Sequence, residues 1–157
     1  MFVRYYMELD LPVEMAVAAL ADRPSEWIPA MVLDAERRGD ALYVEVGLAV
    51  NGQRVLGKVV RSEVGTSTRL GEKTVLPMSW SATGPRGLFP VMEGDLEVAP
   101  LGAERTQLAM SARYRPPLGP LGRAADRAVL HRIAEATIKD FVERVGHALV
   151  SVAAAAL

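Results

Sequence analysis

The amino-acid sequence predicts an α+β fold in which a seven-stranded antiparallel sheet packs against one long C-terminal helix. Three observations predict it. Apolar and polar residues alternate in several runs between positions 42 and 115, as they do in strands with one buried face. Apolar residues recur at helical spacing from about residue 121 to at least 149. One further alternating run, at residues 2–10, precedes two short segments with helical spacing.

The N-terminal run, residues 2–10, is predicted to be the first strand. Its apolar side carries Val3, Tyr5, Met7 and Leu9. The next segment, "PVEMAVAAL", is predicted to be a helix with Pro12 at its first position, and Met15, Ala18 and Ala19 share one helical face. A second short helix is expected in "PSEWIPAM", which Pro29 ends or kinks.

The clearest hairpin signal is Asn51-Gly52, because both residues tolerate the positive φ angles of a type I′ turn. This turn joins a run ending at Val50 to the segment "QRVLGKVVRSEV", of which either face could point inward. In the run 72–83, Pro77 indicates an edge strand or a bulge. The last three strands are predicted to place these side chains inward: Leu76, Met78, Trp80 and Ala82; Met92, Leu96 and Val98; Leu108, Met110, Ala112 and Tyr114.

The segment "RYRPPLGPLGRAADR" is predicted to carry the last strand round into the C-terminal helix. Pro116 and Pro117 end the strand because proline has no N–H to donate, and the following glycines permit a turn. The helix then places one wide apolar arc toward the sheet: Val129, Leu130, Ile133, Ala134, Thr137, Ile138, Phe141, Val145, Ala148 and Leu149. On the solvent side, ion pairs are expected from Glu135 to Lys139 and from Asp140 to Arg144.

The 157 residues are expected to form a single domain over 1–150, followed by an Ala-rich tail, 151–157, that is a helix end or frayed. A net charge of −1 provides no basic surface for nucleic acid. The chain has no cysteine, so it offers no thiolate nucleophile and no cysteine-ligated metal. No signal peptide or transmembrane segment is recognised, and we expect a cytoplasmic protein.

The order of these elements, together with "FPVMEGDLEVAPLG" and "RTQLAMSARYRPPLGPLGRAADRAVLHRIAEATIKDFVERV", resembles the START-like (SRPBCC) superfamily of polyketide cyclases, dehydrases and lipid-transport proteins, which includes Bet v 1-like proteins. The resemblance implies a helix-grip fold, with a curved sheet wrapped around the long helix. It also implies a cavity between sheet and helix for apolar or amphipathic small molecules. It carries no catalytic motif, so no functional residue is transferred.

Charged residues offer few candidates for chemistry. His131 and His147 fall at or outside the edge of the apolar helical arc, and we expect no metal site. Glu93, Asp95 and Glu97 alternate with apolar residues and are expected on the outer face of the sheet.

Two charges in the strand of uncertain orientation are weak catalytic candidates. If that strand turns its charged side inward, Arg61 or Glu63 could serve as an acid, a base or an anchor inside a cavity. The alternative interpretation is an exposed pair without a catalytic role.

The apolar residues expected to face inward are of a kind that suits a pliant pocket, because methionine adapts to varied shapes and aromatic rings offer stacking surface. The predicted ligand-binding residues are Trp27, Met78, Trp80, Met92, Met110, Tyr114, Thr137 and Phe141. We therefore expect binding of a hydrophobic or amphipathic molecule that is lipid-, polyketide- or isoprenoid-like, without a cofactor, in a monomer or homodimer. The alternatives are a polyketide aromatase/cyclase or dehydratase-like enzyme, and a structural or interaction module with a filled core.

Overall fold

The computed structural model of the chain describes residues 1–22, 27, 42–50, 53–82, 91–115 and 127–156. Its elements, in chain order, are β1 (Phe2–Leu9), α1 (Val13–Asp22), β2 (Leu42–Val50), β3 (Gln53–Val64), β4 (Thr68–Leu70), β5 (Lys73–Ala82), β6 (Val91–Pro100), β7 (Thr106–Arg115) and α4 (Arg127–Ala155). The second short helix expected in "PSEWIPAM" lies outside the described residues except for Trp27.

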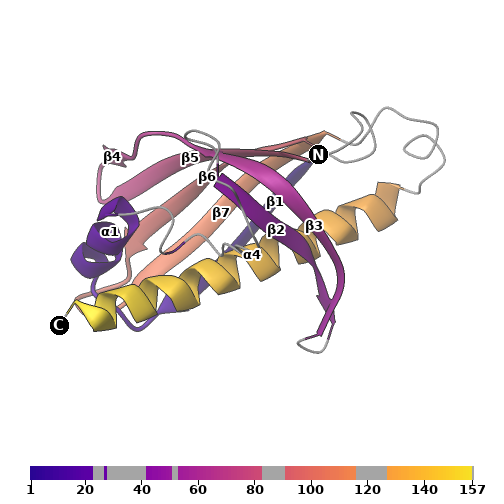
Figure 1. Cartoon of the computed structure of the whole chain (residues 1–157). Coiled ribbons are helices and arrows are strands. Elements are labelled where there is room, and N and C mark those ends of the chain that lie inside the picture. Colours follow the sequence, from indigo (N-terminus) through magenta and orange to yellow (C-terminus); the bar gives the residue numbers. More distant parts are fainter. Residues whose placement is uncertain (23–26, 28–41, 51–52, 83–90, 116–126, 157) are drawn as a thin grey trace.

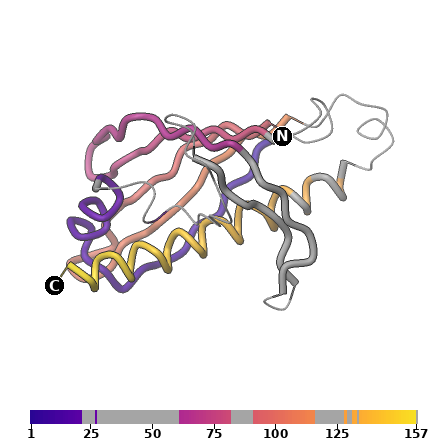
Figure 2. The backbone as a smooth tube through the Cα atoms, viewed as in Figure 1, coloured from indigo at the N-terminus to yellow at the C-terminus, as the bar shows by residue number. Residues whose placement is uncertain are grey.

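The strands form one antiparallel sheet in the order β1-β7-β6-β5-β3-β2, and β4 pairs with β5 beside this path. The sheet curves around α4, which runs along its inner face and contacts both edge strands, β1 and β2 (Figure 1). At one end of the sheet α1 lies beside the C-terminal part of α4, and the N-terminus lies at the opposite end (Figure 2). The predicted α+β helix-grip architecture is confirmed.

Alternation along β1, β5, β6 and β7 divides the sheet into a buried inner face and a more polar outer face. The inner positions predicted from the sequence are confirmed where burial is described. They are Val3 and Leu9 on β1, Leu76, Met78 and Trp80 on β5, Met92, Leu96 and Val98 on β6, and Leu108, Met110, Ala112 and Tyr114 on β7. Tyr5 and Met7 are partly buried and pack against the same core.

The first helix begins at Val13, one residue after the predicted first position, and the Pro12 carbonyl accepts hydrogen bonds from the backbone N–H groups of Met15 and Ala16. Its buried stripe, however, consists of Ala16, Ala19 and Leu20. Ala18, which was predicted to share a helical face with Met15 and Ala19, is exposed. The spacing of i, i+3 and i+4 from Ala16 defines the face that α1 turns toward α4 and β6.

The hairpin of β2 and β3 is formed as predicted, with Val50 opposite Gln53. Its turn, residues 51–52, lies outside the described residues. The pairing shifts register between Leu48 and Ala49, an irregularity that the alternating sequence pattern did not indicate.

Pro77 is not in an edge strand, because β5 pairs with β6 on one side and with β3 and β4 on the other. Its carbonyl accepts a hydrogen bond from the Gly65 N–H at 2.8 Å, but proline cannot return the second bond of that pair. Pairing with β3 ends at Val64 opposite Met78, and pairing with β4 resumes at Val75 in a different register. The missing N–H therefore faces the irregularity between β3 and β4.

Helix α4 lies with its apolar side against the sheet, and Ile138, Phe141, Val142, Val145 and Leu149 are fully buried. The approach to β1 is close at Gly146. A Cβ there would lie 2.6 Å from Met7 Sδ and 3.0 Å from Leu9 Cδ2. The helix continues to Ala155, and Ala153 in the expected tail is buried. The beginning of the predicted helix before residue 127 lies outside the described residues.

Two expected ion pairs on α4 have different outcomes. Asp140 and Arg144 form theirs at 2.9 Å, but their side chains are only 14% and 21% exposed, so this pair is not on the solvent face. Glu135 pairs with His131 at 3.2 Å and Lys139 with Glu143 at 3.9 Å, in place of the expected Glu135–Lys139 pair. Glu135 has a possible partner at i−4, His131, and another at i+4, Lys139. Lys139 has the same choice between Glu135 and Glu143, and the sequence does not decide between the partners.

Within the described part of the chain, neither helix has the length and apolar character needed to cross a membrane.

Candidate functional site

Four inward-facing residues from four strands lie in register across the inner face of the sheet. Tyr114 pairs with Met92, Met92 with Trp80, and Trp80 with Ser62, on β7, β6, β5 and β3 in turn. Each is at most 4% exposed. We call these four residues the aromatic row. It lies at the end of the sheet that is near the N-terminus of the chain, because the Met1 carbonyl accepts a hydrogen bond from the Tyr114 backbone N–H.

The aromatic row meets α4 through Trp80. The ring centroids of Trp80 and Phe141 lie 5.0 Å apart at an interplanar angle of 54°, a tilted arrangement of the kind that aromatic pairs favour. Ala134, two turns earlier on the helix, is buried, and Thr137 between them is partly buried. The contact brings together a sheet residue and a helix residue that were both predicted to bind a ligand.

The neighbouring row on the inner face is low in side-chain volume at its centre, where Ala112 pairs with Gly94. Larger side chains flank them: Val3 beyond Ala112 and Met78 beyond Gly94. Gly94 is required by a close approach of the backbone, since a Cβ would lie 2.6 Å from the Ser111 carbonyl oxygen.

The predicted ligand-binding residues other than Thr137 are therefore buried in one apolar cluster. They are Trp27, Met78, Trp80, Met92, Met110, Tyr114 and Phe141.

Trp27 occupies a specific structural position within this cluster. It is fully buried, and its Nε1–H donates a hydrogen bond of 2.8 Å to the carbonyl of Leu20 in the last turn of α1. The last carbonyls of a helix have no partner inside the helix, so this bond supplies one. The polar atom of Trp27 is thus committed to the fold.

Arg61 and Glu63 point away from the core. Their side chains are 53% and 66% exposed, and they form an ion pair with each other at 3.5 Å. The hypothesis that either places a charge inside the fold was wrong. The reason is the register of β3 with β5, which places Ser62 opposite Trp80 on the inner face.

Ser62 is the residue that sequence reasoning missed. It is 1% exposed, and its Oγ has no hydrogen-bond partner within the part of the chain that the structure describes. The available signal was the triplet Arg61-Ser62-Glu63, in which two charges on one side of a strand favour the middle residue on the buried side.

Two tyrosines bring hydroxyl groups to the inner face. The Tyr5 hydroxyl donates a hydrogen bond of 2.9 Å to Glu143 Oε1, and burial together with this carboxylate raises its pKa. Among the described residues, the Tyr114 hydroxyl donates to the Met1 thioether at 3.6 Å, and burial raises its pKa. Both groups are neutral around pH 7.

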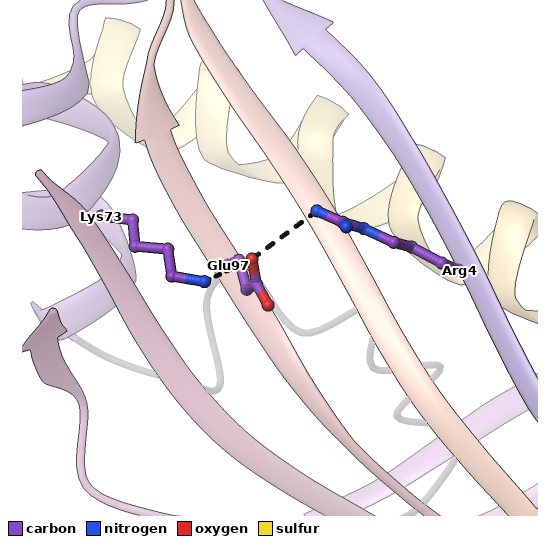
Figure 3. Close-up of polar contacts among 3 residues, drawn as sticks. All are labelled: Arg4, Lys73 and Glu97. Atoms are coloured by element: carbon purple, nitrogen blue, oxygen red, sulfur yellow. Dashed lines mark hydrogen bonds and ion pairs between the residues drawn. The ribbon is translucent and has the colours of Figure 1, made fainter.

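The acidic side chains of β6 lie on the outer face, as predicted. Glu93 and Asp95 are exposed. Glu97 lies between two cations, with its Oε2 at 3.1 Å from Lys73 Nζ and 3.8 Å from an Arg4 guanidinium nitrogen (Figure 3). Its carboxylate is therefore part of a surface charge network on the far side of the sheet from α4.

Neither histidine lies in a cluster of potential metal ligands formed by described residues. His131 pairs with Glu135, and His147 is exposed. No group of three or more His, Cys, Asp or Glu side chains suited to a metal ion occurs among the residues that the structure describes.

Comparison of the whole structure with solved structures gives matches of low sequence identity. A conserved protein from Geobacillus kaustophilus matches with a TM-score of 0.61 and 19% identity over 94% of each chain. A START superfamily protein from Mycobacterium smegmatis matches with a TM-score of 0.57 and 17% identity over 99% of each chain. The chain has a START-like fold.

A third structural neighbour is the Zhui aromatase/cyclase from Streptomyces sp. R1128, with a TM-score of 0.54 and 15% identity over 98% of this chain and 93% of that one. No protein-family model and no curated protein matches the sequence. At these identities the likeness extends to the fold alone.

Proposed function

We propose that this START-like protein binds a hydrophobic or amphipathic small molecule between the sheet and α4, at the aromatic row. The observation that carries the proposal is the chemistry of this part of the inner face. Tyr114, Met92 and Trp80 form an apolar, partly aromatic surface opposite Phe141. Such residues make large contacts with varied ligand shapes and need no charge to do so.

The distribution of charge supports binding without ionic recognition. The described inward-facing side chains of the sheet are all uncharged, whereas Arg61, Glu63 and Glu93 are exposed. A ligand bound there would be held by area removed from water, about 25 cal/mol for each Å² of apolar surface.

Two alternatives to a carrier are an aromatase/cyclase-like enzyme and a structural module. An aromatase/cyclase would need groups that exchange protons near neutral pH, but Arg61 and Glu63 face outward and burial raises the pKa of Tyr114. A structural module would need the inner face to be filled completely. The test below separates both alternatives from a carrier.

The test is native mass spectrometry of the purified protein, followed by thermal-shift titration with fatty acids, flat aromatic polyketide analogues and isoprenoids. A ligand at 100 times its dissociation constant adds about 2.7 kcal/mol to the free energy of unfolding. We expect a co-purified mass or a rise in melting temperature with one class of compound.

The control variant is Tyr6→Ala on β1, which removes a large side chain that is 60% exposed on the outer face. It is expected to keep the ligand-induced shift, whereas Met92→Ala on the inner face is expected to weaken it. Turnover of an analogue would favour the enzyme. Absence of any bound mass and of any shift would favour the filled core.

A further inference from the structure

Ser62 carries a buried hydroxyl without a partner among the described residues, and the proposed function leaves this feature of the inner face unexplained. Ser62 Oγ is enclosed at the β3 end of the aromatic row, and it forms no hydrogen bond with the other described side chains of that row. Leaving a buried polar group unpaired destabilises a fold by about 1–3 kcal/mol. Native proteins keep few such groups, and each one calls for an explanation.

We infer that Ser62 anchors the polar end of the bound molecule, and that this end is a neutral oxygen such as a hydroxyl or a carbonyl. The inference rests on the proposed function and narrows it to a substrate class. A serine hydroxyl can donate one hydrogen bond and accept others, so it pairs with either group. Its cross-strand neighbour Trp80 would lie against the apolar body of the same ligand.

The neutrality of the ligand follows from the charges around the site. A carboxylate buried beside Ser62 would need a cation, since an isolated buried charge is strongly unfavourable. Arg61 is exposed on the opposite face and paired with Glu63. Arg144, which is partly buried on α4, is already paired with Asp140 at 2.9 Å.

Two matched pairs of probes test this inference. Naphthol and methylnaphthalene have nearly the same shape but differ in a hydroxyl, and dodecanol and dodecanoate share a chain but differ in charge. Displacement of the fluorescent dye N-phenylnaphthylamine gives the four dissociation constants. For the wild-type chain we expect naphthol to bind more tightly than methylnaphthalene and dodecanol more tightly than dodecanoate.

The Ser62→Ala variant should weaken naphthol by about threefold to tenfold, the contribution of one hydrogen bond, and leave methylnaphthalene unchanged. The matched control is Ser81→Ala, which removes an exposed hydroxyl next to Trp80 and should change neither constant. Thermal unfolding without ligand gives a second measurement. Ser62→Ala should unfold at the same or a higher temperature, because it removes an unpaired buried group.

The outcomes separate this inference from the function on which it rests. Equal binding of naphthol by wild-type and Ser62→Ala protein would overturn the anchor while leaving the binding function intact. A lower melting temperature of the ligand-free variant would indicate that Ser62 supports the fold, and would also overturn it. Failure of the dye and all four probes to bind the wild-type chain would overturn the proposed function itself.

Discussion

At the scale of single residues, the inner face combines polar atoms that are satisfied by the fold with others that are not. The Trp27 indole N–H and the Tyr5 hydroxyl both have strong acceptors, the Leu20 carbonyl and the Glu143 carboxylate. Ser62 Oγ and the Tyr114 hydroxyl lie on the aromatic row; within the described part of the chain, the serine oxygen has no partner and the tyrosine hydroxyl has a weak one. Among the described residues, the row therefore has hydrogen-bonding capacity that the fold does not use.

The raised pKa of Tyr114 gives a testable dependence of stability on pH. Burial favours the neutral phenol, so the folded-state pKa lies above the unfolded value of about 10. The contribution of the neutral, buried phenol to the free energy of unfolding is fully present below the unfolded pKa. It is lost as the pH rises toward the folded pKa, because the unfolded chain releases the proton first. Chemical denaturation should show Tyr114→Phe losing less stability than the wild type between about pH 9 and about pH 11.

The matched control is Tyr6→Phe, because Tyr6 is 60% exposed on the outer face of β1. This variant should follow the wild-type curve across the same pH range. At neutral pH, Tyr114→Phe should change the free energy of unfolding by less than about 0.5 kcal/mol, since it gives up only a contact with a thioether. Parallel alkaline curves for Tyr114→Phe and wild type would contradict the burial of the phenol.

The sequence identified most of these residues as buried but did not predict their polar contacts. The apolar positions Met92 and Trp80 followed from alternation, which specifies a face. The orientation of Ser62 depended on which strand pairs with β3 and in what register, and this is a long-range relation. No local pattern indicated that Trp27 would bond to the Leu20 carbonyl.

At the scale of secondary-structure elements, Pro77 determines where two strands meet β5. Residues of one strand that face the same neighbour alternate, so Pro77 and Ser79 both direct their backbone groups toward β3. Ser79 lies opposite Glu63 within the paired region, and Pro77 lies just past its end. The sequence indicated an irregularity at the proline, but the choice between an edge strand and a bulge required the pairing on both sides.

This arrangement predicts that a substitution changes stability little at Pro77 and much more at Ser79. Pro77→Ala should change the free energy of unfolding by less than about 1 kcal/mol, because the restored N–H faces the break between β3 and β4. Ser79→Pro should destabilise by at least about 1–3 kcal/mol, because it removes an N–H from the ladder with β3. Urea denaturation measures both, and a larger effect at Pro77 than at Ser79 would refute this account of the pairing.

Helix α4 shows what periodicity predicts well and what it leaves open. Its apolar arc was predicted correctly around Phe141, Val145 and Leu149, because a repeat of 3.6 residues identifies the face. The partial burial of Asp140 and Arg144 was missed, since a polar pair at i and i+4 has the same pattern on a flank as on the solvent face.

At the scale of the whole molecule, the sheet curves around α4 so that both of its edges contact the helix. The fold class could be predicted from the order of the elements, since few arrangements bury a sheet face and a single long helix together. The order of the elements could not predict that the two ends of the inner face differ, because this depends on where α1 and the N-terminus are placed against the sheet. Trp27, whose indole bonds to α1, and Trp80, on the aromatic row, are separate reporters of these two environments.

The central claim is that the ligand binds at the aromatic row, and contact quenching of tryptophan fluorescence tests it most directly. The chain has two tryptophans, so Trp27→Phe leaves only Trp80 and Trp80→Phe leaves only Trp27. Both variants would be titrated with a bromine-tagged undecanol, whose bromine quenches an indole that it touches. We predict saturable quenching in Trp27→Phe and little in Trp80→Phe. Saturable quenching of Trp27 with Trp80 unaffected, or no saturable quenching in either variant, would contradict the claim.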